Sequence, residues 1–219
     1  MESAASTGTE ALDGRPRLHP AVHSLVQADR IPMIENRNDI TVAAIHGKAP
    51  KIHSSAFIAP GCRIIGDVEI GPDVSIWYNC VIRADVNRIV IGARTNIQDG
   101  TVVHCDSPKA GRPEGYPTLI GEDVLIGHMA MVHGCTLEDS AFVGLGAIVM
   151  DGSHIETDGM LAAGAQLTGK RIGAGQLWMG RPAKYIRDLS EDAIVANREG
   201  VARYVINGRN HAEALGVAG

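Results

Sequence analysis

Aromatic side chains are scarce in this chain. Phe, Trp and Tyr make up 4% of its 219 residues, although 45% of the residues are hydrophobic. A core built around large rings is therefore excluded, and we expect an aliphatic interior. No run approaches the roughly 18 apolar residues that a membrane-spanning helix needs. The formal net charge is −5 and the basic residues form no cluster, so the sequence predicts neither a nucleic-acid partner nor an anionic membrane surface.

The four cysteines form no Cys-x-x-Cys pair. Cys62, Cys80 and Cys135 each stand two residues before an aliphatic repeat position, where the other residues are small, so we expect buried, reduced thiols. The N-terminus lacks a charged start followed by an apolar stretch, and Glu2 and Glu10 argue against a mitochondrial transit peptide. We therefore expect a cytoplasmic protein.

An aliphatic residue returns at every sixth position through most of the chain. This period fits neither an amphipathic helix nor a single flat strand. It is typical of a coil in which each six-residue unit forms one short strand and one turn, and three units close one turn of the coil. The fold class predicted is all-β, a parallel β-helix of hexapeptide repeats. The repeat positions are Ile58, Ile64, Ile70, Ile76, Ile82, Ile91, Ile97, Val103, Ile120, Ile126, Val132, Leu137, Val143, Val149, Ile155, Leu161, Leu167, Ile172 and Trp178.

The repeat divides the chain into three parts. Residues 1–39 carry no hexad and hold three prolines, so we expect a partly disordered N-terminal extension. Residues 40–187 form the predicted β-helix domain. Residues 188–219 form a predicted C-terminal α-helix and tail, with the helix packed alongside the coil. Ser190 is suited to cap that helix, and Gly208 is predicted to end it.

Two insertions interrupt the repeat. Three extra residues stand between Ile82 and Ile91, and eleven stand between Val103 and Ile120. The second insertion holds three prolines and two glycines and predicts a protruding loop. Insertions at a corner of a repeat protein usually lie on its working face.

The repeat also predicts which side chains are neighbours. Positions three units apart share a face, so Val132 lies one coil beyond Val103. His104 and His133 each follow these positions by one residue and should lie on adjacent strands about 4.8 Å apart. Arg83 follows Ile82 and belongs to the same column.

A third histidine belongs to another column. His128 follows Ile126 by two residues, as Asp99 follows Ile97, so Asp99 and His128 should be neighbours near a corner. A catalytic zinc ion takes three protein ligands and keeps one open position. One chain offers two histidines on one face, and if coils pack side by side as a threefold homo-oligomer, His128 of one chain could meet His104 and His133 of its neighbour.

The segment SIWYNCVIRADVNRIVIGARTNIQDGTVVH at 75–104, with GHMAMVHGC at 127–135, closely resembles the gamma-class carbonic anhydrase family. The resemblance covers roughly residues 40–187, and its RADxN, NIQDG…H and GHxxxxHG elements are specific in combination. It implies a left-handed parallel β-helix, a homotrimer, and zinc (or iron or cobalt) between subunits. It also implies that His104 and His133 of one subunit and His128 of the next bind the metal. The implied reaction is the reversible hydration of CO2 to bicarbonate.

The resemblance implies further roles by position. Arg83 and Asp85 match an interface ion pair near the site. Asn96, Gln98 and Asp99 match residues in and around the pocket, where Gln98 would orient the bound water or CO2.

The chain departs from this family at two places. The best-known branch carries a glutamate where this chain has Val86. It also carries a proton-shuttle glutamate in an acidic loop, whereas the loop here, CDSPKAGRPEGYP, holds only Asp106 and Glu114 as acids. Hydration releases a proton in each turnover, so a missing shuttle would slow it.

Two other functions are compatible with the repeat. Acyltransferases that use CoA or an acyl-carrier protein share this fold, but they typically use a single histidine base, and the three matched histidines argue against them. A metal-binding homologue or scaffold without catalysis is the other alternative.

Overall fold

The computed structural model describes residues 39–216. Residues 1–38 and 217–219 lie outside this part, and with them nearly all of the predicted extension. The described chain folds into successive short strands followed by one long helix, α2 (Glu191–Leu215). Strands of successive coils pair in parallel, and the antiparallel pairing of β19 with β20 is the exception among the named strands of this part.

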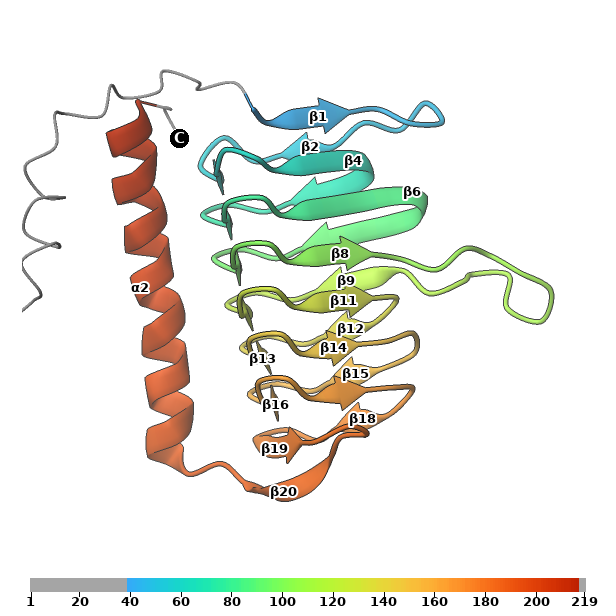
Figure 1. Ribbon diagram of the computed structural model, residues 1–219, viewed down its shortest axis with the longest axis vertical. Coiled ribbons are helices and arrows are strands. Elements are labelled where there is room, and N and C mark those ends of the chain that lie inside the picture. The colour runs from blue at the N-terminus through green and yellow to red at the C-terminus, as the bar shows by residue number, and fades with distance from the viewer. Residues whose placement is uncertain (1–38, 217–219) are drawn as a thin grey trace, which may run out of the picture. The chain divides into compact units, whose positions relative to one another are not determined.

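The strands form two hydrogen-bonded sheets (Figure 1). The first contains β1 (Thr41–Ala43), β2 (Lys51–Ile52), β4 (Arg63–Ile70), β6 (Val81–Ile91), β8 (Val102–His104), β9 (Thr118–Ile120), β11 (Met131–His133), β12 (Thr136–Leu137), β14 (Ile148–Val149), β15 (His154–Ile155), β17 (Gln166–Leu167) and β18 (Arg171–Ile172). The second contains β3 (Phe57–Ile58), β5 (Ser75–Ile76), β7 (Asn96–Ile97), β10 (Leu125–Ile126), β13 (Phe142–Val143), β16 (Met160–Leu161), β19 (Gln176–Met179) and β20 (Lys184–Asp188).

The coil has three faces. The second sheet is one of them, and we call it the helix face because α2 contacts β3, β5 and β7. The first sheet supplies the other two. We call β8, β11, β14 and β17 the histidine face, while β9, β12, β15 and β18 form the third face. The predicted parallel β-helix with a helix alongside is confirmed.

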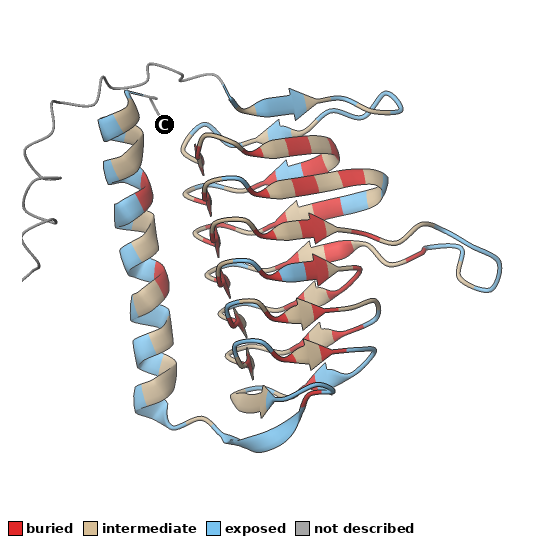
Figure 2. Ribbon diagram, viewed as in Figure 1, coloured by how far each residue is buried: buried red, intermediate tan, exposed pale blue. Residues whose placement is uncertain are grey.

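The aliphatic repeat positions fill the interior of the coil. Ile64, Ile82, Ile97 and Ile126 are fully buried, and only the ends of the register, such as Trp178, are partly exposed. Figure 2 shows buried and less buried residues alternating along the longer strands. The residues that recur with a period of six are therefore the core residues of the coil.

The two insertions have different structures. The three extra residues after Ile82 lie within one continuous strand, β6, which joins two faces and pairs with β4 before Asp85 and again after Arg88. The longer insertion forms the predicted protruding loop between β8 and β9 (Figure 1). Backbone bridges between Asp106 and Tyr116 and between Lys109 and Arg112 close this loop.

Helix α2 begins where predicted and ends later than predicted. The Ser190 side chain accepts a hydrogen bond from the Ala193 backbone N–H and caps the helix. The prediction that Gly208 ends it is wrong, because the helix continues to Leu215, where Gly216 takes a left-handed φ of 60°. Gly208 instead serves close packing, since a Cβ on it would lie 3.3 Å from the Ser75 Cβ and 3.5 Å from the Phe57 Cβ.

The cysteines are free and buried, as predicted for three of them. The Cys62 and Cys80 thiols donate to backbone carbonyls of Trp77 and Gln98, at 3.0 and 3.1 Å. Among the described residues, no helix is long and apolar enough to cross a membrane.

Candidate metal centre

His104 and His133 end neighbouring strands of the histidine face. Strands β8 and β11 pair in register, with His104 opposite His133, which confirms the predicted column. The His104 Nδ1 and His133 Nε2 atoms lie 3.0 Å apart. Both side chains are largely covered, with 18% and 25% of their surface exposed. The backbone hydrogen bonds between β8 and β11 therefore place the two imidazole nitrogens next to each other.

The outer nitrogen of each imidazole meets a carboxylate. His104 Nε2 lies 2.8 Å from Asp85 Oδ1, and His133 Nδ1 lies 2.5 Å from Asp151 Oδ1. A carboxylate only accepts, so it holds the ring hydrogen of a neutral imidazole on the outer nitrogen. The two inner nitrogens then face each other with lone pairs, an arrangement that needs a cation or a shared proton between them. Two nitrogens bound to one tetrahedral zinc ion stand about 3.3 Å apart, so the pair fits zinc.

Asp151 was not predicted from the sequence. It follows the repeat position Val149 by two residues, one coil beyond Gly134. A Cβ on Gly134 would lie 2.3 Å from Asp151 Oδ1, so the glycine leaves the space through which this carboxylate reaches His133. The position of Asp151 in the repeat, one coil beyond Gly134, is the feature of the sequence from which its contact with His133 could have been predicted.

Arg83 and Asp85 form the predicted ion pair. Burial opposes ionisation of Asp85, but hydrogen bonds from His104 and Arg83 outweigh it and lower the pKa of this carboxyl below its usual value. Asp85 is therefore a charged acceptor near neutral pH and holds His104 from one side and Arg83 from the other.

His128 and Asp99 are neighbours at another corner, as predicted. His128 Nδ1 lies 2.7 Å from Asp99 Oδ2, and both side chains are 41% exposed. The corner joins β10 of the helix face to β11 of the histidine face. Asn96 and Gln98 lie beside it on the helix face, where the buried Gln98 amide donates to Asn96 Oδ1 at 3.2 Å.

The two histidine groups stand at opposite edges of the histidine face. Strand β11 runs from the His128 corner to His133, a span on the order of 10 Å. Within residues 39–216, no cluster of three or more His, Cys, Asp or Glu side chains could hold a metal ion. One chain thus presents an imidazole pair at one edge and a single carboxylate-held imidazole at the other.

The departures from the family pattern lie close to the imidazole pair in sequence. Val86 is 42% exposed and offers no proton acceptor. In the following loop, the Asp106 carboxylate is engaged by Lys109 Nζ at 2.7 Å. The Asn87 amide donates to the backbone carbonyls of Asp106 and Glu114 at 2.9 and 2.8 Å and ties the loop to β6. Asn87 thus has a structural function that sequence reasoning missed.

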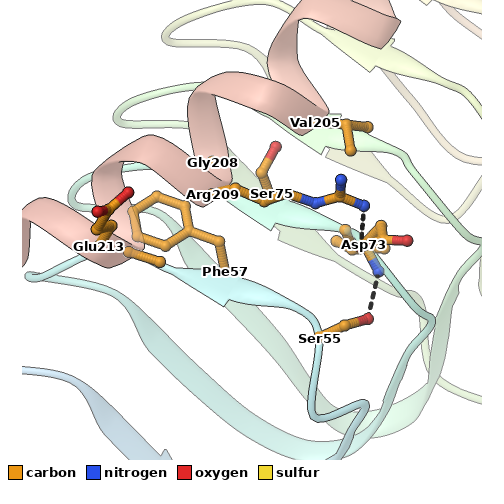
Figure 3. Close-up of a pocket in the computed structure, with 10 residues that line it drawn as sticks. Ser55, Phe57, Asp73, Ser75, Val205, Gly208, Arg209 and Glu213 are labelled. Atoms are coloured by element: carbon orange, nitrogen blue, oxygen red, sulfur yellow. Dashed lines mark hydrogen bonds and ion pairs between the residues drawn. The ribbon is translucent and has the colours of Figure 1, made fainter. Parts of the chain in front are cut away.

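A separate cavity of about 290 Å³ lies between α2 and strands β3 and β5 (Figure 3). Phe57 and Val205 contribute apolar surface, and Arg209 reaches Asp73 at 3.1 Å across it. None of the predicted site residues lines this cavity, so it is distinct from both histidine groups.

Comparison with known proteins identifies the family of the chain. Residues 49–84 match the family described as "Bacterial transferase hexapeptide (six repeats)". Gamma carbonic anhydrase 2, mitochondrial, of Arabidopsis thaliana is 43% identical over 173 residues, which are 78% of this chain and 62% of the relative. The probable carbonic anhydrase of Methanocaldococcus jannaschii is 43% identical over 155 residues, which are 70% of this chain and 93% of the relative.

Solved structures share the fold. The crystal structure of a hexapeptide transferase family protein from Anaplasma phagocytophilum has a TM-score of 0.72 and 45% sequence identity, covering 78% of this chain and 97% of that chain. The coil, its repeat and these similarities define a hexapeptide-repeat protein. Within that class, the chain belongs to the gamma-class carbonic anhydrase family. It spans 62% of the length of the Arabidopsis relative.

Proposed function

We propose that this protein is a zinc-dependent carbonic anhydrase that hydrates CO2 to bicarbonate at the interfaces of a homotrimer. The observation that carries the proposal is the imidazole pair, whose inner nitrogens lie 3.0 Å apart while carboxylates hold both outer nitrogens. Such a donor set suits Zn2+ and leaves coordination positions open.

The third ligand is proposed to be His128 of the neighbouring subunit. Exposed apolar side chains surround its corner, which supports burial of this surface against a second copy. Met129 is 72% exposed, Leu145 52% and Met131 43%. Leu145 occupies the position of His128 one coil further on, and Met131 lies on the strand between the two histidine groups. A closed ring of three chains would pair every imidazole pair with a His128.

His104 and His133 of one chain and His128 of the next would hold the zinc ion, which would supply hydroxide near neutral pH for attack on CO2. The chain's own residues prepare the ligands. Asp85 and Asp151 fix the ring orientation and tautomer of His104 and His133, and Asp99 does the same for His128. Arg83 keeps Asp85 charged and in place.

Gln98 is proposed to orient the small substrate. Its side chain is 4% exposed and lies one residue before Asp99, and Asn96 accepts its N–H. A buried amide held in this way suits a ligand as small as CO2, because its dipole is fixed before the ligand arrives.

The substitution Asp151→Asn is expected to weaken zinc binding by about 10- to 100-fold. The amide keeps the shape of the carboxylate but can donate as well as accept, so it no longer fixes the hydrogen of His133 on Nδ1. A competition titration with a zinc chelator measures the loss. Glu138→Gln is the matched control, because Glu138 holds His154 at 2.6 Å on the third face, away from the imidazole pair. Equal losses in both variants would contradict the proposed role of Asp151.

Metal analysis and CO2 hydration test the function itself. We expect one metal ion per chain and stopped-flow hydration well above the buffer rate with zinc or with iron loaded anaerobically. A full metal site without hydration would instead support a metal-binding scaffold without catalysis.

The acyltransferase alternative is favoured by the transferase name of the Anaplasma structure. Stabilisation by acetyl-CoA in a thermal shift assay, without stabilisation by zinc, would support it.

A cytoplasmic location is proposed on the strength of the four free thiols. Fractionation of the source cells with compartment markers tests it, and recovery in another compartment would overturn it.

A further inference from the structure

His211 of α2 lies in an aromatic cluster at the same edge of the coil as His128. Its Nδ1 is 2.9 Å from the Tyr78 hydroxyl. The Trp77 ring packs edge-on against the imidazole at a centroid distance of 4.9 Å, and Phe57 lies 6.1 Å away. The imidazole is half-buried, so it is held in place and still reaches solvent.

Tyr78 stands in one column with Asp99 and His128. The three residues follow Ile76, Ile97 and Ile126 by two positions, at the corners after β5, β7 and β10. Backbone hydrogen bonds join these corners, since the Gly100 N–H donates to the Tyr78 carbonyl and the Met129 N–H donates to the Asp99 carbonyl, each at 2.9 Å. Two strand spacings separate Tyr78 from His128, which is about 10 Å.

The electrostatics also connect the cluster to this corner. Burial and the negative charge of Asp99 raise the pKa of Tyr78, and the same two causes raise the pKa of Tyr204 on α2. Both phenols therefore stay protonated near neutral pH and can pass a hydrogen on. Tyr78 is the titratable side chain bonded to His211, and Tyr204 packs against Trp77 of the same cluster at a centroid distance of 5.5 Å.

We propose that His211, acting through Tyr78, is the proton-transfer residue of the hydration reaction. This inference rests on the proposed function. Imidazole takes up and releases protons near neutral pH, as a proton carrier must. It would supply proton transfer in a chain that has Val86 where the best-known branch of the family carries a glutamate.

The proton balance is simple. The proton released in each hydration reaches the Tyr78 oxygen through water molecules along the Asp99 corner. The Tyr78 hydroxyl hydrogen moves at the same time to His211 Nδ1, so the phenol is neutral before and after. His211 then gives one proton to buffer, and no other species is consumed.

The test compares His211→Gln and Tyr78→Phe with a control, His53→Gln, in the zinc-loaded protein. His53 is an exposed imidazole that is bonded to Ser55 at 2.9 Å rather than to Tyr78. At low buffer concentration we expect kcat to fall about 10- to 100-fold in both test variants, while kcat/KM and zinc content stay near wild type. Added imidazole buffer should restore kcat in His211→Gln, which a purely structural defect would not allow.

A second readout does not depend on turnover. The 15N and 1H resonances of the His211 ring in the zinc-loaded protein should shift in Tyr78→Phe, because the ring then loses its hydrogen-bond partner. Ring resonances that are unchanged in Tyr78→Phe would overturn the inference, as would an unchanged kcat or a loss that imidazole does not rescue. A zinc-loaded wild type without hydration would overturn the proposed function and this inference with it, whereas a wild-type rate retained by His211→Gln would overturn this inference alone.

Discussion

The substitution His128→Ala is expected to abolish metal binding, although it leaves the imidazole pair of the same chain intact. In the proposed trimer, each site loses the ligand that a neighbour supplies. Because loss of a residue that merely orients a ligand costs 10- to 100-fold in affinity, loss of the ligand itself should cost more than about 100-fold. Metal analysis after dialysis should fall from one ion per chain to near zero, and CO2 hydration should fall to the buffer rate.

Mixed subunits make this prediction specific for an interface site. His128→Ala chains keep a working imidazole pair, and His104→Ala chains keep a working His128. After the two are unfolded together and reassembled in equal amounts, about a quarter of the sites should combine both working halves. His154→Ala is the control, because His154 is a carboxylate-held imidazole of the third face. Unchanged metal content in His128→Ala, or no recovery in the mixture, would contradict the shared site.

The substitution Gly144→Val is expected to destabilise the coil by about 3 kcal/mol. A Cβ at this position would lie 2.3 Å from the Ala163 backbone nitrogen and 2.6 Å from the Ala162 carbonyl carbon on the next coil. Backbone atoms cannot rotate away, so the two coils would have to separate. Thermal denaturation followed by circular dichroism should show unfolding roughly 10 °C below wild type at equal protein concentration.

Gly146→Asn is the matched control, two residues away. Gly146 has a φ of 62°, but no atom within 4 Å would meet its Cβ. Asn79 and Met129 adopt φ values of 61° and 58° at the same repeat position, so Asn should fit there. Wild-type stability of Gly144→Val would show that the coils are not in such close contact.

The aliphatic period alone predicts most of the fold. Because it states which residues point inward, it also predicts that His104 lies beside His133 and Asp99 beside His128. What binds to these side chains is not contained in the period. The assignment of ligands and of Gln98 rests on the family resemblance and stays a prediction.

Other features depend on contacts that a one-dimensional pattern does not contain. Asp151 reaches His133 because Gly134 lacks a side chain, which is visible only when two coils are stacked. Glycine is typical of a helix end, but Gly208 lies within α2, where its lack of a Cβ allows the helix to approach Phe57. Non-glycine residues such as Asn79 and Met129 occupy left-handed corners, so glycine content alone does not locate the turns.

The parallel pairing of β8 with β11 sets the distance between the backbones of His104 and His133. The main-chain ladder sets the separation of the two Cα atoms, and that ladder is the same wherever two coils meet. Changes in neighbouring side chains can rotate the rings but cannot alter this spacing. The arrangement consists of two histidines one coil apart, each with an acidic partner. In principle, the same four residues could be introduced at any other pair of neighbouring coils. In the proposed trimer, any preference among metal ions would then come from the carboxylates and the facing subunit rather than from the scaffold.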